Sequence, residues 1–294
     1  MHKLVFTAIG LFIIASLVLV LTEKDKPQTI EILALKENRS LLISDNDENV
    51  IITLFLSQKD SFFTAIDYIQ SCRIEDDEEE IELEVIDIIA GNEVLYKGNT
   101  YWQYQFVLGF HEVFVRDSIL EFADARCVVE YENDVELAIA IGGITLCLID
   151  ICQTVHLDFL RLFGNTEILS EGERLASITI ELENRGFDTV MIKGIETYVT
   201  GMDISLDNGS IIIDGESEPI TIESFRLPPG DGVLCNFKVN FVNDSLPVYR
   251  FPLFITYEYL GIEYKLIIDD FPYFRKAPFY EVDDAIVATY LYHY

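Results

Sequence analysis

Residues 81–87 read IELEVID, so apolar and acidic side chains alternate along this stretch. Residues 178–183 read ITIELE and repeat the alternation of apolar and polar side chains. A period of two is typical of a β-strand that has one face on a core and the other in water. The two stretches therefore predict half-buried strands, and they indicate the fold class of the chain.

Turn residues punctuate the chain from Thr29 onward. Gly, Pro, Asn and Asp cluster at short intervals, which favours tight turns between strands. No long stretch has the spacing of an amphipathic helix, and no glycine-rich phosphate loop follows a strand. This pattern predicts an all-β protein of antiparallel sandwiches. The clusters lie at 91–92, 98–99, 184–186, 207–209 and 228–230.

The chain has 294 residues, of which 50% are hydrophobic and 12% aromatic, and its formal net charge is −31. The apolar content suffices for a folded core, which excludes a disordered chain. The negative charge would repel nucleic acid, so we expect no nucleic-acid partner. The length predicts about two domains.

An uncharged apolar run opens the chain. It extends from Leu4 to Leu21, follows Lys3, and is long enough to cross a bilayer as a helix. The positive charge before the run predicts a cytoplasmic N-terminus, with the bulk of the chain extracytoplasmic. A cleaved signal peptide and a retained anchor both fit, and the bulky residues that end the run favour the anchor. We therefore expect a single-pass protein of the cell membrane.

The exterior part contains a weak internal repeat. Residues 52–59 align with residues 178–185, and Tyr131 aligns with Tyr257 at the same offset. Such self-similarity indicates two related domains. The alternative is a chance alignment of two segments that are both rich in strands.

The second repeat carries a more recognisable pattern. Residues 168–173 read ILSEGE and precede a strand that ends in NRG, residues 184–186, while residues 225–230, FRLPPG, precede the strand 237–241. Glycine supplies positive φ in such turns, and proline fixes the chain before a strand. The pattern resembles the immunoglobulin-like β-sandwiches of prokaryotic surface proteins, of the cell-adhesion-related type. This resemblance implies a fold and a surface location but no particular binding site.

The repeat and the resemblance together predict the organisation of the chain. We expect an all-β protein with two tandem immunoglobulin-like antiparallel β-sandwiches after one N-terminal transmembrane helix. Residues 1–26 would form the anchor, 28–152 the first sandwich, 154–275 the second, and 276–294 a tyrosine-rich C-terminal tail or extra strand.

Two of the five cysteines stand on expected strands of the first domain. The spacing of Cys72 and Cys127 is close to that of the disulfide between the sheets of immunoglobulin-type sandwiches. A bridge between them would suit an oxidising exterior, whereas two unpaired buried thiols are the alternative. No Cys-x-x-Cys pair supports a zinc or thioredoxin-like site.

Acidic side chains concentrate in two runs, residues 45–49 (DNDEN) and residues 75–80 (EDDEEE). Clustered oxygen ligands outside the cell suit calcium, but Val50 stands where a calcium loop of the EF-hand type requires glycine. We therefore expect solvated acidic turns and no cofactor, with a structural calcium ion as the alternative.

Three Asn-x-Ser sequons lie on turn-like segments and are candidate glycosylation sites. Their asparagines are Asn38, Asn208 and Asn243.

Tyrosines alternate near the C-terminus. A strand would place Tyr290, Tyr292 and Tyr294 on one face. One interpretation is an interaction strand that pairs with the edge of a partner's sheet. The other is a last strand that covers the protein's own sandwich.

Catalytic motifs are missing from this sequence. It contains no His-Glu-x-x-His and no Gly-x-Ser-x-Gly, so we expect no enzyme. The predicted role is a membrane-anchored interaction or scaffold protein with protein partners at the cell surface, in adhesion, envelope organisation or a surface complex. Two alternatives remain. One is an extracellular carbohydrate-binding module or hydrolase with a site in the acidic loops, and the other is a filament subunit that donates its C-terminal strand.

Overall fold

The computed structural model describes residues 29–43, 49–110, 118–132, 134–149, 156–169, 172–213, 216–220, 224–241, 250–272 and 284–293. Within these ranges the chain forms β-strands, with short 3₁₀ turns η1 (Phe62–Thr64), η2 (Ile66–Tyr68) and η4 (Asp284–Ile286). The all-β prediction is confirmed. None of the described helical segments is long and apolar enough to span a membrane, and the expected anchor from Leu4 to Leu21 lies outside the described ranges.

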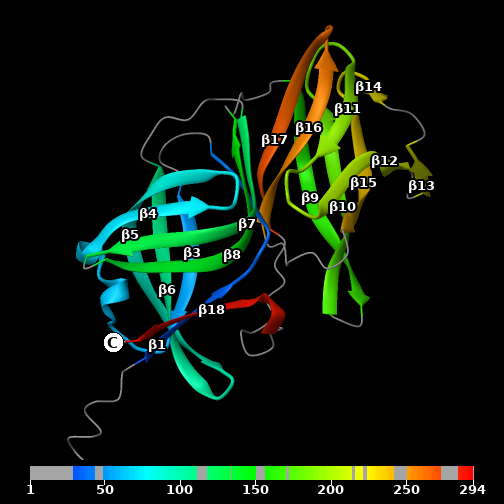
Figure 1. The fold of residues 1–294 in the computed structure, drawn as a ribbon. Coiled ribbons are helices and arrows are strands. Elements are labelled where there is room, and N and C mark those ends of the chain that lie inside the picture. The colour runs from blue at the N-terminus through cyan, green and yellow to red at the C-terminus, as the bar shows by residue number, and fades with distance from the viewer. Residues whose placement is uncertain are drawn as a thin grey trace, which may run out of the picture.

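Nine strands form one sheet, which we call the first unit (Figure 1). The order in the sheet is β18-β1-β3-β6-β5-β4-β7-β8-β2, and all pairs are antiparallel except β2 with β8. The strands are β1 (Thr29–Leu35), β2 (Arg39–Leu42), β3 (Val50–Leu56), β4 (Ile69–Glu75), β5 (Glu80–Tyr96), β6 (Asn99–Phe110), β7 (Ser118–Tyr131), β8 (Val135–Leu148) and β18 (Val287–His293).

The alternation in residues 81–85 places side chains as predicted. Ile81 and Leu83 are buried in the core of the first unit, while Glu82 and Glu84 are exposed. The alternation ends at Ile86, which is 52% exposed, because the register of β5 with β6 shifts between Val85 and Asp87.

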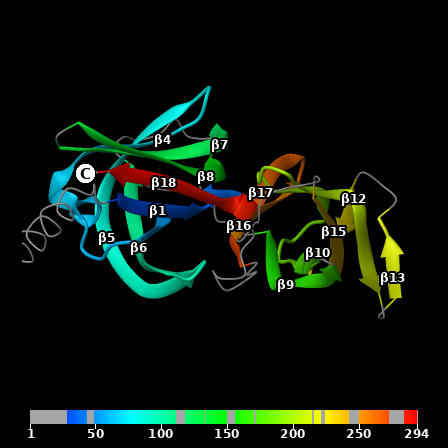
Figure 2. The same ribbon diagram turned by 60° about the horizontal axis from the view of Figure 1, so that its bottom comes forward.

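The chain returns to the first unit at its C-terminal end. β18 pairs with β1 in an antiparallel register that runs from Thr29↔His293 to Leu35↔Val287. Figure 2 shows these two strands side by side. The hydroxyl of Tyr290 also donates to the carbonyl oxygen of Glu136 on β8, at 2.5 Å. The sheet therefore curls, so that β18 at one end of the strand order approaches β8 near the other end.

The remaining strands form the second unit, a sandwich of two sheets around one core. One sheet has the order β13-β12-β15-β10-β9 and the other β14-β11-β16-β17. The strands are β9 (Leu157–Leu169), β10 (Gly172–Asn184), β11 (Val190–Glu196), β12 (Met202–Ile213), β13 (Glu216–Pro219), β14 (Phe225–Leu227), β15 (Gly232–Phe241), β16 (Arg250–Tyr259) and β17 (Ile262–Pro272).

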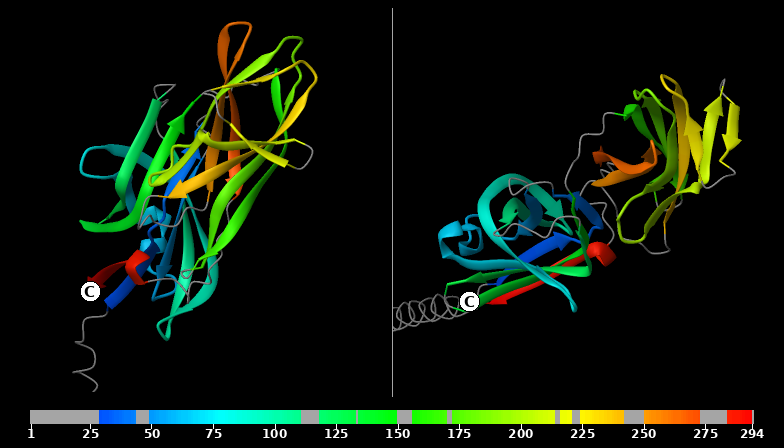
Figure 3. Two further views of the ribbon diagram at one scale, coloured as in Figure 1. Left: turned by 90° about the vertical axis from the view of Figure 1, so that its right-hand side faces the viewer. Right: turned by 90° about the horizontal axis from the view of Figure 1, so that it is seen from above.

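The strand order of the second unit is that of a constant-type immunoglobulin domain with two added strands. With β13 and β14 set aside, the first, second, fifth and fourth strands share one sheet, and the third, sixth and seventh share the other. The first unit differs, because its described strands form one continuous sheet. β18 and β2 extend that sheet at its two ends. The two units lie end to end, with β16 and β17 of the second unit nearest the first (Figures 1 and 3).

Candidate functional site

The far end of the second unit exposes three large apolar side chains, which we call the distal tip. They are Phe187, Leu260 and Ile262, with exposed fractions of 98%, 66% and 58%. Leu260 lies in the turn between β16 and β17, the hairpin that points away from the first unit in Figure 1. Phe187 belongs to the same end, because its N–H donates to the hydroxyl of Tyr259 at 3.1 Å. Large exposed apolar patches mark interaction sites, so the distal tip is a candidate interaction site.

The side chain of Asn184 stabilises the turn that carries Phe187 through hydrogen bonds. This side chain is fully buried, and its amide nitrogen donates to the carbonyl oxygens of Asp188 at 2.9 Å and Leu227 at 2.8 Å. Its amide oxygen accepts from the N–H of Gly186 at 2.8 Å. The apolar tip residue therefore stands on a rigid turn.

A polar groove of about 770 Å³ crosses the outer face of the five-stranded sheet in the second unit. The register of β12 with β15 shifts between Ile204 and Gly209, next to the part of β12 that lines the groove. Its walls carry amide, hydroxyl and carboxylate groups, with Lys238 as a cation. Six of the polar lining residues are Ser177, Asp207, Asn208, Ser210, Asn236 and Asn240.

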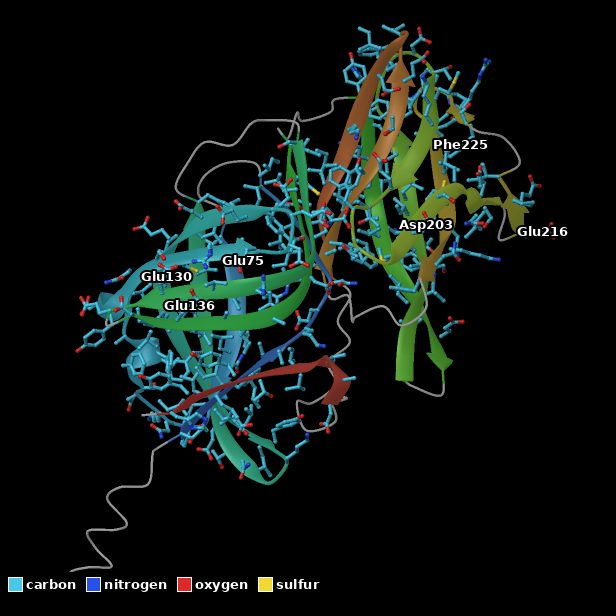
Figure 4. All side chains as sticks on the ribbon, in the orientation of Figure 1. Glu75, Glu130, Glu136, Asp203, Glu216 and Phe225 are labelled. Carbon is cyan, nitrogen blue, oxygen red and sulfur yellow. The ribbon has the colours of Figure 1, made fainter. Side chains whose placement is uncertain are left out.

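Three glutamates of the first unit, Glu75, Glu130 and Glu136, surround Arg73, and Figure 4 labels them. The guanidinium of Arg73 lies 2.7 Å from Glu75, 2.6 Å from Glu130 and 3.7 Å from Glu136. The hydrogen bonds that Arg73 donates to Glu75 and then to Glu130 raise its pKa above the usual value. The pKa of Glu130 is lowered by a hydrogen bond from Ser71 and by Arg73. The shifts of Arg73 and Glu130 both favour their charged forms.

The acidic run at residues 75–80 forms a turn. Asp76 accepts the N–H groups of Glu78 and Glu79 through one oxygen, both at 2.9 Å, and that of Ala123 through the other at 3.1 Å. These bonds, that from Glu78 first, lower the pKa of Asp76. Across the described part of the chain, no group of three or more His, Cys, Asp or Glu side chains is arranged to hold a metal ion. Residues 45–48 of the other acidic run lie outside that part.

The predicted cysteine pair lies on adjacent strands of one sheet. Cys72 on β4 is opposite Val129, and Cys127 on β7 is opposite Ile74, so the two thiols are diagonal neighbours. Both are buried thiols without a bond between them. A hydrogen bond with Cys72 and then burial raise the pKa of Cys127. The disulfide stays a prediction, which a titration of free thiols in the denatured protein checks.

The C-terminal tyrosines belong to the first unit. Tyr292 packs against Phe62 and Phe63, with ring centroids 5.5 and 5.3 Å apart, and Tyr290 packs against Phe63. Tyr290 and Tyr292 therefore pack on the protein's own sheet, while Tyr294 lies outside the described residues.

The three sequons occupy different surroundings. Asn208 is exposed at the rim of the polar groove, and Asn243 lies outside the described residues. Asn38 is only 4% exposed, because its amide donates to Thr200 of the second unit at 2.7 Å and accepts from Gly143 at 3.2 Å. A glycan on Asn38 would need the space that the second unit occupies.

Asn38 is part of a close junction between the units. Leu42 and Cys147 of the first unit form a buried apolar cluster with Phe254 of β16. The backbone of Glu37 runs so close to β8 that a Cβ on Gly142 would lie 2.2 Å from its carbonyl oxygen, and Gly142 has a φ of +97°. Only glycine suits that position. That approach lies within the first unit, whereas a Cβ on Gly143 would lie 3.3 Å from the hydroxyl of Thr200 in the second unit. Sequence reasoning missed this junction, although the Gly142-Gly143 pair was a visible signal.

Comparisons with known proteins give little direct guidance. No family model matches the chain, and no curated protein matches it. Among solved structures it is similar to the C-terminal domain of the AgI/II polypeptide BspA of Streptococcus agalactiae. The identity is 11% over 79% of this chain and 96% of that one, with a TM-score of 0.21. A second structure, BspA_C_WT, has 13% identity over 79% and 97%, and a TM-score of 0.22.

Proposed function

We propose that this chain is a surface interaction protein that presents the distal tip away from a membrane. The observation that carries the proposal is the position of the tip relative to residue 29. Thr29 pairs with His293 at one end of the molecule, and Leu260 lies at the opposite end (Figure 1). An anchor formed by Leu4 to Leu21 would be separated from Thr29 by seven residues, so the membrane would lie on that side of the molecule and the tip would be outermost.

The same proposal assigns the domains. The first domain consists of residues 29–148 together with residues 287–293, and the second, residues 157–272, is inserted between β8 and β18. The insertion holds the second domain by two chain crossings and by the buried cluster around Phe254. A unit fixed in this way suits presentation of a binding surface, since little orientational freedom is lost when a partner binds.

The test is photo-crosslinking in living cells with the full chain. A photoreactive amino acid at Leu260 is expected to give a discrete adduct with a protein partner, and one at Glu93, on the exposed β5–β6 hairpin of the first unit, none. Cell fractionation is expected to find the full chain in the membrane fraction and a chain without residues 1–28 outside it. Failure of the tip to crosslink in a correctly localised protein would overturn the interaction role.

One observation favours a carbohydrate-binding role as a second candidate. The polar groove offers planar amides and hydroxyls, which can donate and accept hydrogen bonds at neighbouring sugar hydroxyls. Binding of an oligosaccharide from a glycan array, lost in Asn236→Ala and kept in Leu260→Ser, would support this role against the tip.

The filament alternative is not proposed, because β18 is already used within the same chain. The acidic-loop hydrolase is not proposed either. The carboxylate of Asp76 accepts hydrogen bonds from three backbone N–H groups, so it stabilises the turn between β4 and β5.

A further inference from the structure

The sheet of the first unit splits between β4 and β5. The two strands pair only from Glu75↔Glu80 to Cys72↔Leu83. Beyond that point β5 continues with β6 as its partner, and the beginning of β4 has β7 as its partner. No described strand occupies the angle between them, which we call the notch.

Both sides of the notch present strand edges. On β5 the edge runs from Val85 toward the hairpin, and on β4 it comprises Ile69 to Ser71. Ile86 and Ile89 on β5 are 52% and 46% exposed. A long strand edge with exposed apolar side chains is a template for pairing with a further strand.

The notch encloses a cavity of about 580 Å³ with an apolar floor and an acidic rim. Ile66, Leu83 and Val85 supply apolar lining, and Glu82, Glu84 and Glu130 supply carboxylates. Arg73 is the one cationic residue in this lining, against the three carboxylates. The rim is therefore negative overall.

We propose that the notch binds an extended, basic peptide segment of a partner protein, which adds as a strand between β4 and β5. This inference rests on the interaction role proposed above and names a partner class for a second surface. The peptide pairs mainly with β5, because β5 offers the longer edge. We expect the pairing to be antiparallel, because antiparallel pairs are slightly more stable per residue. Alternate side chains of the peptide then face the apolar floor, and those between them face the acidic rim. The recognised pattern is apolar residues alternating with lysine or arginine.

A second copy of this chain is a poorer occupant. Edge-to-edge pairing of two β5 strands would bring Glu84 and Asp87 of both copies together, and like charges on paired strands destabilise the pairing. Each copy also carries a net charge of −31, which opposes association.

The test is binding of a labelled peptide, KVKVKVK, to the full-length protein, followed by fluorescence anisotropy and amide hydrogen exchange. Saturable binding with slower exchange in residues 69–71 and 85–89 is expected. A peptide with proline in place of the central valine is expected not to bind, since proline lacks the N–H that a strand needs.

Charge-reversal variants separate the notch from general attraction to an acidic protein. Glu82→Lys with Glu84→Lys is expected to weaken binding about tenfold or more. Glu78→Lys with Glu79→Lys makes the same change of net charge in the neighbouring turn and is expected to leave the affinity within about twofold. Equal loss in both variants, binding of the proline peptide, or a dimer through β5 in sedimentation would each overturn the proposal. If the notch binds no peptide while Leu260 still crosslinks, this inference fails and the proposed function stands.

Discussion

At the end of β10 the side chain of Asn184 joins three segments of backbone. Its amide binds the turn at Gly186 and Asp188 and the end of β14 at Leu227. Its own carbonyl oxygen accepts from the N–H of Gly230 at 2.9 Å. The Asn-Arg-Gly sequence signalled a turn, but nothing in it showed that the asparagine would be fully buried beneath the distal tip.

Asn184→Ala is expected to lower the free energy of unfolding by about 2–4 kcal/mol, because three hydrogen bonds are lost and their buried backbone partners remain unpaired. Urea denaturation measures the change. Asn208→Ala is the control, since that side chain is exposed and should change stability by about 0.5 kcal/mol or less. Equal effects in both variants would contradict the role given to Asn184.

Tyr101 makes the free energy of unfolding depend on pH in the alkaline range. It is 2% exposed and donates to Glu31 at 2.7 Å, and burial followed by this bond raises its pKa to about 12. The unfolded chain gives up this proton near the ordinary value of about 10. Stability from Tyr101 is therefore complete below pH 10 and is lost as pH rises toward 12.

Tyr101→Phe is expected to flatten the fall in the urea midpoint between pH 10 and 12, without abolishing it, because burial also raises the pKa of Tyr131. Tyr68→Phe, at an exposed position, should leave the slope unchanged. An unchanged slope in Tyr101→Phe would exclude this tyrosine as a source of the pH dependence.

At the scale of elements, β5 and β18 mark what the sequence could predict. The alternation at residues 81–85 fixed a strand and its buried face, because that information is local. The pairing of β18 with β1 was not predictable, since the two strands stand at opposite ends of the chain and neither carries a signal for the other. The notch depends on where β4 begins relative to β5, a matter of register that no single residue reveals.

Loss of β18 tests its place in the first unit. A chain ending at residue 286 loses the strand beside β1 and the tyrosines that cover Phe62 and Phe63. Faster amide exchange is expected in β1 and in the part of β8 near Glu136, with β10 and β15 unchanged. Unaltered exchange in β1 would show that β18 adds no stability. Leu291→Ala, on the exposed face of β18, is the control and should leave exchange in β1 as it is.

At the scale of the whole molecule, the inserted second unit makes its orientation depend on the junction. This unit follows β8 and precedes β18 in the chain. It contacts the first unit through the hydrogen bond from Asn38 to Thr200 and through the cluster of Leu42, Cys147 and Phe254. In the tandem arrangement predicted from the repeat, the chain would not pair again with the first unit after the second, as β18 does here. A domain held by two crossings and a buried cluster keeps one direction, which a presented tip requires.

Phe254→Ala is therefore expected to loosen the second unit while leaving its core intact. The side chain is fully buried at the junction, and its removal should cost about 3–5 kcal/mol at that place. Spin labels at Leu95 and Leu260, both exposed, report the distance between the units. A narrow distance distribution in the parent protein should broaden in Phe254→Ala. Phe237→Ala removes a side chain of the same size from the core of the second unit and should keep the distribution narrow. Equal widths in the two variants would mean that the chain crossings alone set the orientation of the tip.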